Sequence, residues 1–465
     1  MVFSGTTFLF LFLPVSLGIH LLLPRGGKWR SLWSVAVSLL FYAWAEVKSL
    51  PLIGACAVWV YGAGRIIEAQ QKRGKKGRLA LLAGMMLPAG ALIWCKYAGW
   101  LANSVNALLG TGLPVIKSFL PLGLSFYTFS MVAYLVDVYR GKGVIRDFLR
   151  WLESVFFFGK MTAGPIANYP LLKLAQVPGQ GPVQFGEGIW RFCIGLGKKA
   201  ILSTSLAGLM SDFAASTERS ALYCWLYAAA VVGSIYFDFS GYSDMALGIG
   251  RMFGYALPEN FDHPLAAASV SDFWRRWHKS LGAWFRDYIY IPLGGSRRGT
   301  GRLILSTMAV WLFTGLWHGA DWGYALWGIF FGTLVLAEKG PWGKLLKKLP
   351  KVLGHIYVAL TVLVGFVIFG GLGLEKSLQV IGGMFGGGSA GAEGIYALRS
   401  YGGLLAVSLI AALPIGKHIG AWMRGRKGWQ AVYALWRPIW AAAMLVLAAA
   451  WIVDGSFSPF FYAQY

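Results

Sequence analysis

Residues 303–337 read LILSTMAVWLFTGLWHGADWGYALWGIFFGTLVLA, and in this stretch only His318 and Asp321 carry side chains that ionise readily. Basic residues stand on both flanks, before it at Arg297, Arg298 and Arg302 and after it at Lys339, Lys344, Lys347 and Lys348. Basic flanks favour the cytoplasmic side, so the stretch is predicted to enter the membrane and return, with Trp317-His318-Gly319 near the turn. A helix of 16 residues from Leu303 would rise about 24 Å, which places His318 deep in a hydrocarbon core of roughly 30 Å.

The same apolar character extends along all 465 residues. The chain is 57% hydrophobic and 13% charged, and its mean hydropathy of +0.58 excludes a water-soluble globular protein. Apolar runs of spanning length recur, and we predict an all-α polytopic membrane protein with about 11 to 14 membrane-embedded helices. The first run, residues 2–24, lacks a basic start and a small-residue cleavage site, so it is expected to be a retained span rather than a signal peptide.

The formal net charge is +23, a value that could indicate a protein that binds nucleic acid. The basic residues lie in short loops between apolar runs, at 65–78, 140–150, 297–302, 344–351 and 424–427. This distribution is typical of cytoplasmic loops facing anionic lipid, so membrane lipid and not nucleic acid is the expected partner. The four cysteines show no CxxC spacing, and no nucleotide or calcium motif is present, so no metal and no permanently bound cofactor are predicted.

Polar residues concentrate between residues 121 and 292, and six of the 19 acidic residues fall in one window of about 50 residues. Such residues beside membrane spans indicate a lined cavity. For Asp238 and Asp244, helix capping or hydrogen bonding to neighbouring helices is an equal alternative. The candidate lining of a substrate tunnel comprises Asp238, Ser240, Tyr242, Asp244, Asn260, Trp274, Arg276, Trp277, Trp317 and Asp321.

The segment 274–290, WRRWHKSLGAWFRDYIY, has the spacing of one amphipathic helix. An apolar stripe predicts that it lies at the interface or re-enters between other helices, and Asp272 can pair with Arg276 at i,i+4. Trp274, Trp277, Leu281, Trp284 and Tyr288 form this stripe.

His318 is the first candidate for catalysis. A buried neutral imidazole can accept a proton from an alcohol that attacks a carbonyl, which is acyl-transfer chemistry. Gly315 and Gly319 would let another backbone or a substrate approach closely. A packed structural histidine is the alternative. His278, among Arg275, Arg276 and Lys279, is the second candidate, with an interfacial structural histidine as its alternative.

At these residues the chain resembles the membrane-bound O-acyltransferase family, and within it the bacterial alginate O-acetylase-like branch. Two segments containing histidine carry most of the resemblance, SDFWRRWHKSLGAWFRDYIYIPLGGSRRG at 271–299 and GLWHGADWGYALWG at 315–328. Further matching segments are FLFLFLP at 8–14, PLGLSFYTFSMVAYLVDVYRG at 121–141, FDFSGYSDMALGIGRMFGYALPENFDHPL at 237–265 and SPFFYAQY at 458–465.

The resemblance implies that His278 and His318 are the two functional histidines, with His318 catalytic. It also implies a ring of helices around a thin re-entrant centre or tunnel, where a cytoplasmic thioester donor meets an extracytoplasmic acceptor. Two positions depart from the family pattern. Asn168 stands where relatives often have Arg, and Phe331 stands where they often repeat a His-Gly pair.

The sequence is thus interpreted as one integral-membrane domain over 1–465, with N-terminal hairpins at 1–113, a catalytic core at 114–340 and C-terminal helices at 341–465. We expect an O-acyltransferase of a bacterial cytoplasmic membrane that passes acetyl from a cytoplasmic thioester to a cell-surface polysaccharide through a periplasmic or extracellular SGNH-type partner. The expected donor is acetyl-CoA, with another acyl thioester as the alternative. D-alanyl transfer to teichoic acid from a carrier protein is the alternative in the same chemistry. A proton-coupled transporter is the alternative from another class.

Overall fold

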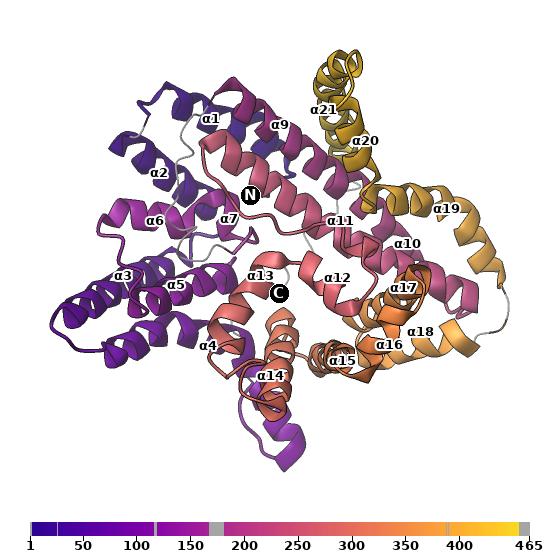
Figure 1. Cartoon of the computed structure of the whole chain (residues 1–465), viewed down its shortest axis with the longest axis horizontal. Helices are drawn as coiled ribbons and strands as arrows, with labels where there is room; N and C mark the ends of the chain where they lie inside the picture. Colours follow the sequence, from indigo (N-terminus) through magenta and orange to yellow (C-terminus); the bar gives the residue numbers. More distant parts are fainter. Residues whose placement is uncertain are drawn as a thin grey trace. The chain divides into compact units, whose positions relative to one another are not determined.

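The computed structural model describes residues 2–25, 27–115, 119–166, 181–386, 388 and 390–454. Every regular element in these ranges is a helix, which confirms the all-α prediction. Asn168 and the terminal segment 458–465 lie outside the described residues. Figure 1 shows the helices in chain order by colour.

Seven helices of the described chain are long and apolar enough to cross a membrane, so the protein is polytopic. Shorter apolar helices cover Phe8–Leu22 and Leu124–Tyr139, the first of them within the run predicted to be a retained span. The predicted number of 11 to 14 also included re-entrant helices, which length alone does not detect. The seven candidates are Leu50–Lys72, Arg78–Leu109, Pro182–Ala215, Ala221–Phe253, Lys351–Phe369, Ala392–Ala412 and Trp429–Val453.

The chain divides into two compact units, Met1–Ile189 with Met245–Pro258, and Trp190–Asp244 with Glu259–Tyr465. The predicted division at residues 113 and 340 is a different partition of the sequence and stays a prediction.

The first unit is built around three packed helices, α3 (Leu50–Lys72), α4 (Arg78–Leu109) and α5 (Leu124–Tyr139). They approach closely because glycines occupy the contacts. A Cβ on Gly64 would lie 2.7 Å from the Tyr134 ring, and one on Gly84 would lie 2.6 Å from the Ala63 side chain. The other helices with residues in this unit are η1 (Phe8–Phe12), α1 (Leu13–Leu22), α2 (Lys28–Ala45), α6 (Phe148–Phe156) and α7 (Phe158–Met161), together with the start of α9 (Pro182–Gly197) and the end of α11 (Ala221–Phe253).

The second unit contains both candidate histidines. Its central feature is a helical hairpin of α14 (Thr300–His318) and α15 (Trp322–Lys339), whose two arms pack along each other. The hairpin turns directly after His318, as predicted from the basic flanks. The second unit also contains the end of α9 and the first part of α11. Its remaining helices are η2 (Lys198–Ser203), α10 (Thr204–Ala215), η3 (Pro264–Ala266), α12 (Val270–Arg276), α13 (Lys279–Phe285), η4 (Arg286–Tyr290), α16 (Pro341–Lys348), α17 (Lys351–Phe369), α18 (Leu374–Gly386), α19 (Ala392–Ala412), α20 (Ile415–Arg424) and α21 (Trp429–Val453).

The prediction of a single amphipathic helix over 274–290 is wrong. The segment is broken into α12, α13 and the π-helix η4, with the first break at Trp277 and His278. His278 adopts the left-handed conformation, with φ 43° and ψ 53°, which ends α12 and starts α13 in a new direction. Side-chain periodicity does not reveal such a break, because the apolar spacing continues across it.

Candidate active site

His318 is the last residue of α14, and the turn that follows it is tightly held. Gly319 caps α14, and the carboxylate of Asp321 accepts a hydrogen bond of 2.7 Å from the backbone N–H of Gly323. Asp321 is therefore the N-cap of α15, and its exposed side chain serves the hairpin turn.

Glycines bring the two arms of the hairpin into backbone contact. A Cβ on Gly315 would overlap the carbonyl oxygen of Tyr324, and one on Gly319 would overlap the Tyr324 ring. Gly328 faces Gly315 and is equally constrained by the Trp311 carbonyl. The close backbone approach predicted at Gly315 is confirmed, whereas the group packed against Gly319 is the Tyr324 side chain. Both contacts fix the position of the intervening Trp317 and His318.

The imidazole of His318 is enclosed by aromatic rings and is only 4% exposed. Its ring centroid lies 4.7 Å from Trp317, 4.8 Å from Phe369 and 5.3 Å from Trp327, all in edge-to-face geometry. Such an apolar enclosure strengthens any polar interaction that forms inside it.

His278 is also buried, and its ring contacts the same tryptophan. The ring centroids of His278 and Trp317 are 5.9 Å apart, and Phe239 of α11 lies 4.6 Å away on a T-shaped contact. Burial lowers the pKa of His278 to about 3, so the ring is neutral at ordinary pH. The structure therefore brings both predicted histidines to one aromatic cluster, with Trp317 touching each.

Asn260 forms the polar contact of His278. Its Oδ1 lies 3.0 Å from Nδ1 of His278 and accepts hydrogen bonds from the backbone N and the Oγ of Ser280 at 3.2 and 2.9 Å. Its Nδ2 donates to Ser243 Oγ of α11 at 3.2 Å. Asn260 itself is fully buried.

Two of the three acidic residues predicted to line a tunnel, Asp238 and Asp244, are held in ion pairs. Asp244 accepts from Arg191 Nε and from Lys198 Nζ, each at 2.7 Å, and Asp238 pairs with Lys199. These contacts agree with the alternative of bonding to a neighbouring helix, because the cations belong to α9 and η2. Sequence reasoning missed these partners, although cations inside the apolar run 182–215 were a usable signal.

The remaining candidates for the tunnel lining are three polar residues, Arg276, Ser240 and Tyr242, and two tryptophans, Trp274 and Trp277, that pack among other aromatic rings. Arg276 pairs with Asp272 at 2.8 Å, which confirms the predicted i,i+4 contact. Ser240 and Tyr242 are buried on α11. Trp274 packs against Trp311, Trp327 and Phe331, while Trp277 packs against Phe273 and Phe366. Phe331, one of the departures from the family pattern, thus fills an aromatic core position.

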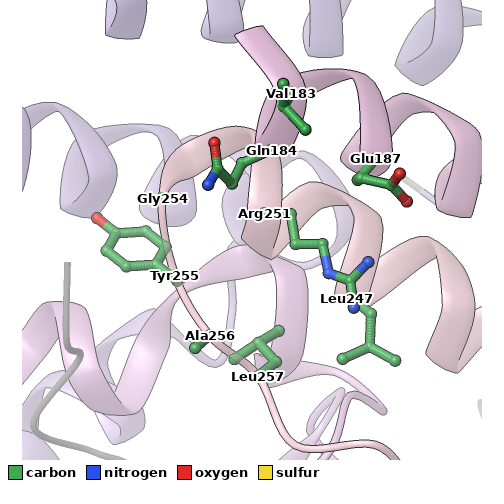
Figure 2. Close-up of a pocket in the computed structure, with 9 residues that line it drawn as sticks. All are labelled: Val183, Gln184, Glu187, Leu247, Arg251, Gly254, Tyr255, Ala256 and Leu257. Atoms are coloured by element: carbon green, nitrogen blue, oxygen red, sulfur yellow. The ribbon is translucent and has the colours of Figure 1, made fainter. Parts of the chain in front are cut away.

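A separate cavity of about 380 Å³ lies in the first unit (Figure 2). Gln184 and Glu187 of α9 and Arg251 of α11 supply its polar side chains, and the rest of its lining is mainly apolar. Within the described ranges no cluster of three or more His, Cys, Asp or Glu side chains could hold a metal ion.

Comparison with known proteins decides the chemistry. Residues 115–348, half of the chain, match the membrane-bound O-acyltransferase family. A probable alginate O-acetylase of Azotobacter vinelandii is 36% identical over 83% of this chain and 78% of its own length. This chain belongs to the membrane-bound O-acyltransferase family. It is accordingly a multi-pass membrane O-acyltransferase, and the transporter alternative loses its basis.

Two further relatives of this O-acyltransferase differ in the acceptor that their names give. A peptidoglycan O-acetyltransferase of Helicobacter pylori is 31% identical over 83% of this chain and 80% of its own length. A teichoic acid D-alanyltransferase of Bacillus subtilis is 28% identical, over 54% of this chain and 67% of its own length. The matches to the two O-acetylating proteins therefore extend over more of the chain than the match to the D-alanyl enzyme.

Proposed function

We propose that this chain passes an acetyl group from a cytoplasmic thioester, acetyl-CoA, across a bacterial cytoplasmic membrane to a hydroxyl of a cell-surface polysaccharide. A periplasmic or extracellular SGNH-type transferase completes the delivery. The names and long matches of the O-acetylating relatives support this reaction. The observation that carries it is the pair of buried histidines, His278 and His318, in contact with one tryptophan.

His318 acts as general base in this proposal. Its neutral imidazole takes the proton of the incoming hydroxyl, whose oxygen forms a C–O bond with the acyl carbon while the C–S bond of the thioester breaks. The proton then passes to the departing thiolate. Transient acylation of the His318 ring is the alternative order of the same steps. His278 positions the donor or relays the proton.

The test is acetyl transfer by His318→Ala in membranes and as purified protein incubated with labelled acetyl-CoA. Loss of a general base lowers turnover by about 10²- to 10⁴-fold, with expression unchanged. His418→Ala is the matched control, because His418 is an exposed histidine of α20. Acetylation retained in His318→Ala would overturn the assignment.

D-alanyl transfer remains the second candidate because of the teichoic acid relative. Acetyl transfer and D-alanyl transfer are distinguished by offering the purified protein either acetyl-CoA or a D-alanyl thioester on a carrier protein. Transfer from the carrier alone would replace the acetyl donor while keeping His318 in its role.

A further inference from the structure

His278 occupies a backbone conformation that an ordinary side chain avoids. Among the described residues other than glycine, only His263 and His278 have positive φ, and the left-handed region is unfavourable for an L-residue. Backbone hydrogen bonds hold the break on both sides. Lys279 N donates to the Asn260 carbonyl at 2.9 Å, and Asp262 N donates to the Arg276 carbonyl at 3.0 Å. Strain that surrounding contacts maintain is a feature of functional positions.

The hydrogen bonds of Asn260 determine which ring nitrogen of His278 carries the proton. The backbone N–H of Ser280 can only donate, so the Asn260 atom that faces it at 3.2 Å is the carbonyl oxygen Oδ1. The same oxygen faces Nδ1 of His278 at 3.0 Å. An oxygen acceptor requires a donor, so Nδ1 carries the hydrogen. In a neutral imidazole Nε2 then has the free lone pair.

Nε2 of His278 is buried and has no hydrogen-bond partner within the described structure. A buried acceptor without a partner destabilises the folded protein, because it has lost its hydrogen bonds to water. Such an atom is suited to a proton or donor that arrives with the substrate.

Residues of α11 and α9 hold Asn260 in its orientation. Its Nδ2 donates a hydrogen bond to Ser243 Oγ. The preceding residue, Glu259, accepts hydrogen bonds from both terminal nitrogens of Arg191, at 2.6 and 3.2 Å. The Nε of Arg191 binds Asp244, next to Ser243 in the chain. A flipped amide would place its NH₂ group against the backbone N–H of Ser280, which can only donate, so this contact selects one orientation of the amide.

We propose that Asn260 is a positioning residue of the acyl-transfer site, which fixes the Nδ1–H tautomer of His278 and makes Nε2 its proton-accepting atom. The inference rests on the proposed function and narrows the role of His278. An amide oxygen is not a base at ordinary pH, so a proton cannot leave through Nδ1 to Asn260. In the relay role, His278 therefore takes up at Nε2 the proton that His318 has removed from the hydroxyl, and it returns this proton from Nε2 to the thiolate sulfur.

The kinetic test compares Asn260→Leu, which removes the acceptor at similar size, with Asn260→Asp, which keeps an oxygen facing Nδ1. Asn260→Leu should lower kcat about 100-fold or more, with little change in KM for the thioester. Asn260→Asp should recover most of kcat and move the acid limb of its pH profile upward, since a carboxylate beside the ring favours the imidazolium. The exposed Asn103→Leu is the matched control.

The groups facing His278 are uncharged, so this shift of the pH profile can be attributed to the residue at position 260. Phe239 of α11, Trp317 of α14 and Asn260 contact its ring, and all are uncharged. The neighbouring cations are engaged or exposed, since Arg276 pairs with Asp272 and Lys279 is exposed. A new carboxylate at position 260 would therefore be the dominant charge on the ring.

The second readout needs no turnover. In protein labelled with ¹⁵N-histidine, His278 should show a protonated Nδ1 and an unprotonated Nε2, with its signals assigned by their loss in His278→Asn. Asn260→Leu should mix or reverse this tautomer. A wild-type ring protonated at Nε2, or full kcat in Asn260→Leu, would overturn the inference. If Asn260→Leu does not fold, the wild-type spectrum and the Asn260→Asp profile still decide. If wild-type protein transfers no acetyl group, the proposed function fails while the tautomer remains measurable.

Discussion

Lys199 and Asp238 form an ion pair in which each side chain is only 2% exposed. Removing one member leaves the other charge buried, so Lys199→Met or Asp238→Leu should each destabilise the fold by about 3–5 kcal/mol. The double variant Lys199→Met/Asp238→Leu replaces the pair with apolar groups and should recover most of that loss. Thermal unfolding in detergent, followed by tryptophan fluorescence, measures all three.

The same double variant tests the predicted tunnel lining. If Asp238 serves only to join η2 to α11, the recovered protein should also recover acetyl transfer. A stable but inactive double variant would instead place Asp238 in contact with substrate. Additive losses in the double variant would contradict the pairing itself.

Gly315 allows the two arms of the His318 hairpin to touch. Gly315→Ala would drive a methyl group into the Tyr324 carbonyl, and overpacking of this kind costs typically about 1–3 kcal/mol. We expect a lower unfolding temperature and reduced acetyl transfer. Gly301→Ala in the same helix meets no atom within 4 Å and should leave both unchanged or raise stability by up to about 1 kcal/mol. Equal effects of the two substitutions would refute the close-approach argument.

Asp321 caps α15 by accepting the hydrogen bond from the backbone N–H of Gly323. Asp321→Ala should cost about 1 kcal/mol, whereas Asp321→Ser keeps a capping oxygen and should retain stability and most of the transfer activity. Paired unfolding and activity measurements on the two variants check this. Loss of activity in both variants, with stability kept in the serine variant, would show that the carboxylate takes part in catalysis.

Stability should depend on pH through His278. Burial lowers its folded pKa from 6.5 to about 3, so between these values the unfolded chain binds a proton that the folded chain does not. Stability therefore falls as pH drops below about 6.5. From pH 7.5 to pH 5 the loss attributable to this group is about 2 kcal/mol. The unfolding temperature of His278→Asn should fall less over that interval than that of wild type, and parallel curves would contradict a buried neutral ring.

The sequence was sufficient to predict the hairpin around His318. Charge at both ends and apolar residues between them specify a segment that enters and returns, and glycines mark where its arms meet. It was insufficient for the break at His278, because the tryptophan spacing continues through it and the left-handed backbone depends on contacts from Asn260, 18 residues earlier. The cations that pair with Asp238 and Asp244 are more than 35 residues away in sequence, and only the packing of η2 against α11 identifies them.

The left-handed backbone of His278 determines how substitutions at this position should be chosen. Alanine carries a Cβ but no polar side chain to support positive φ, so His278→Ala would change the backbone energy and the chemistry together. Asparagine tolerates this conformation and glycine adopts it freely. Among variants of His278, asparagine and glycine are therefore the ones whose loss of activity reports the imidazole alone.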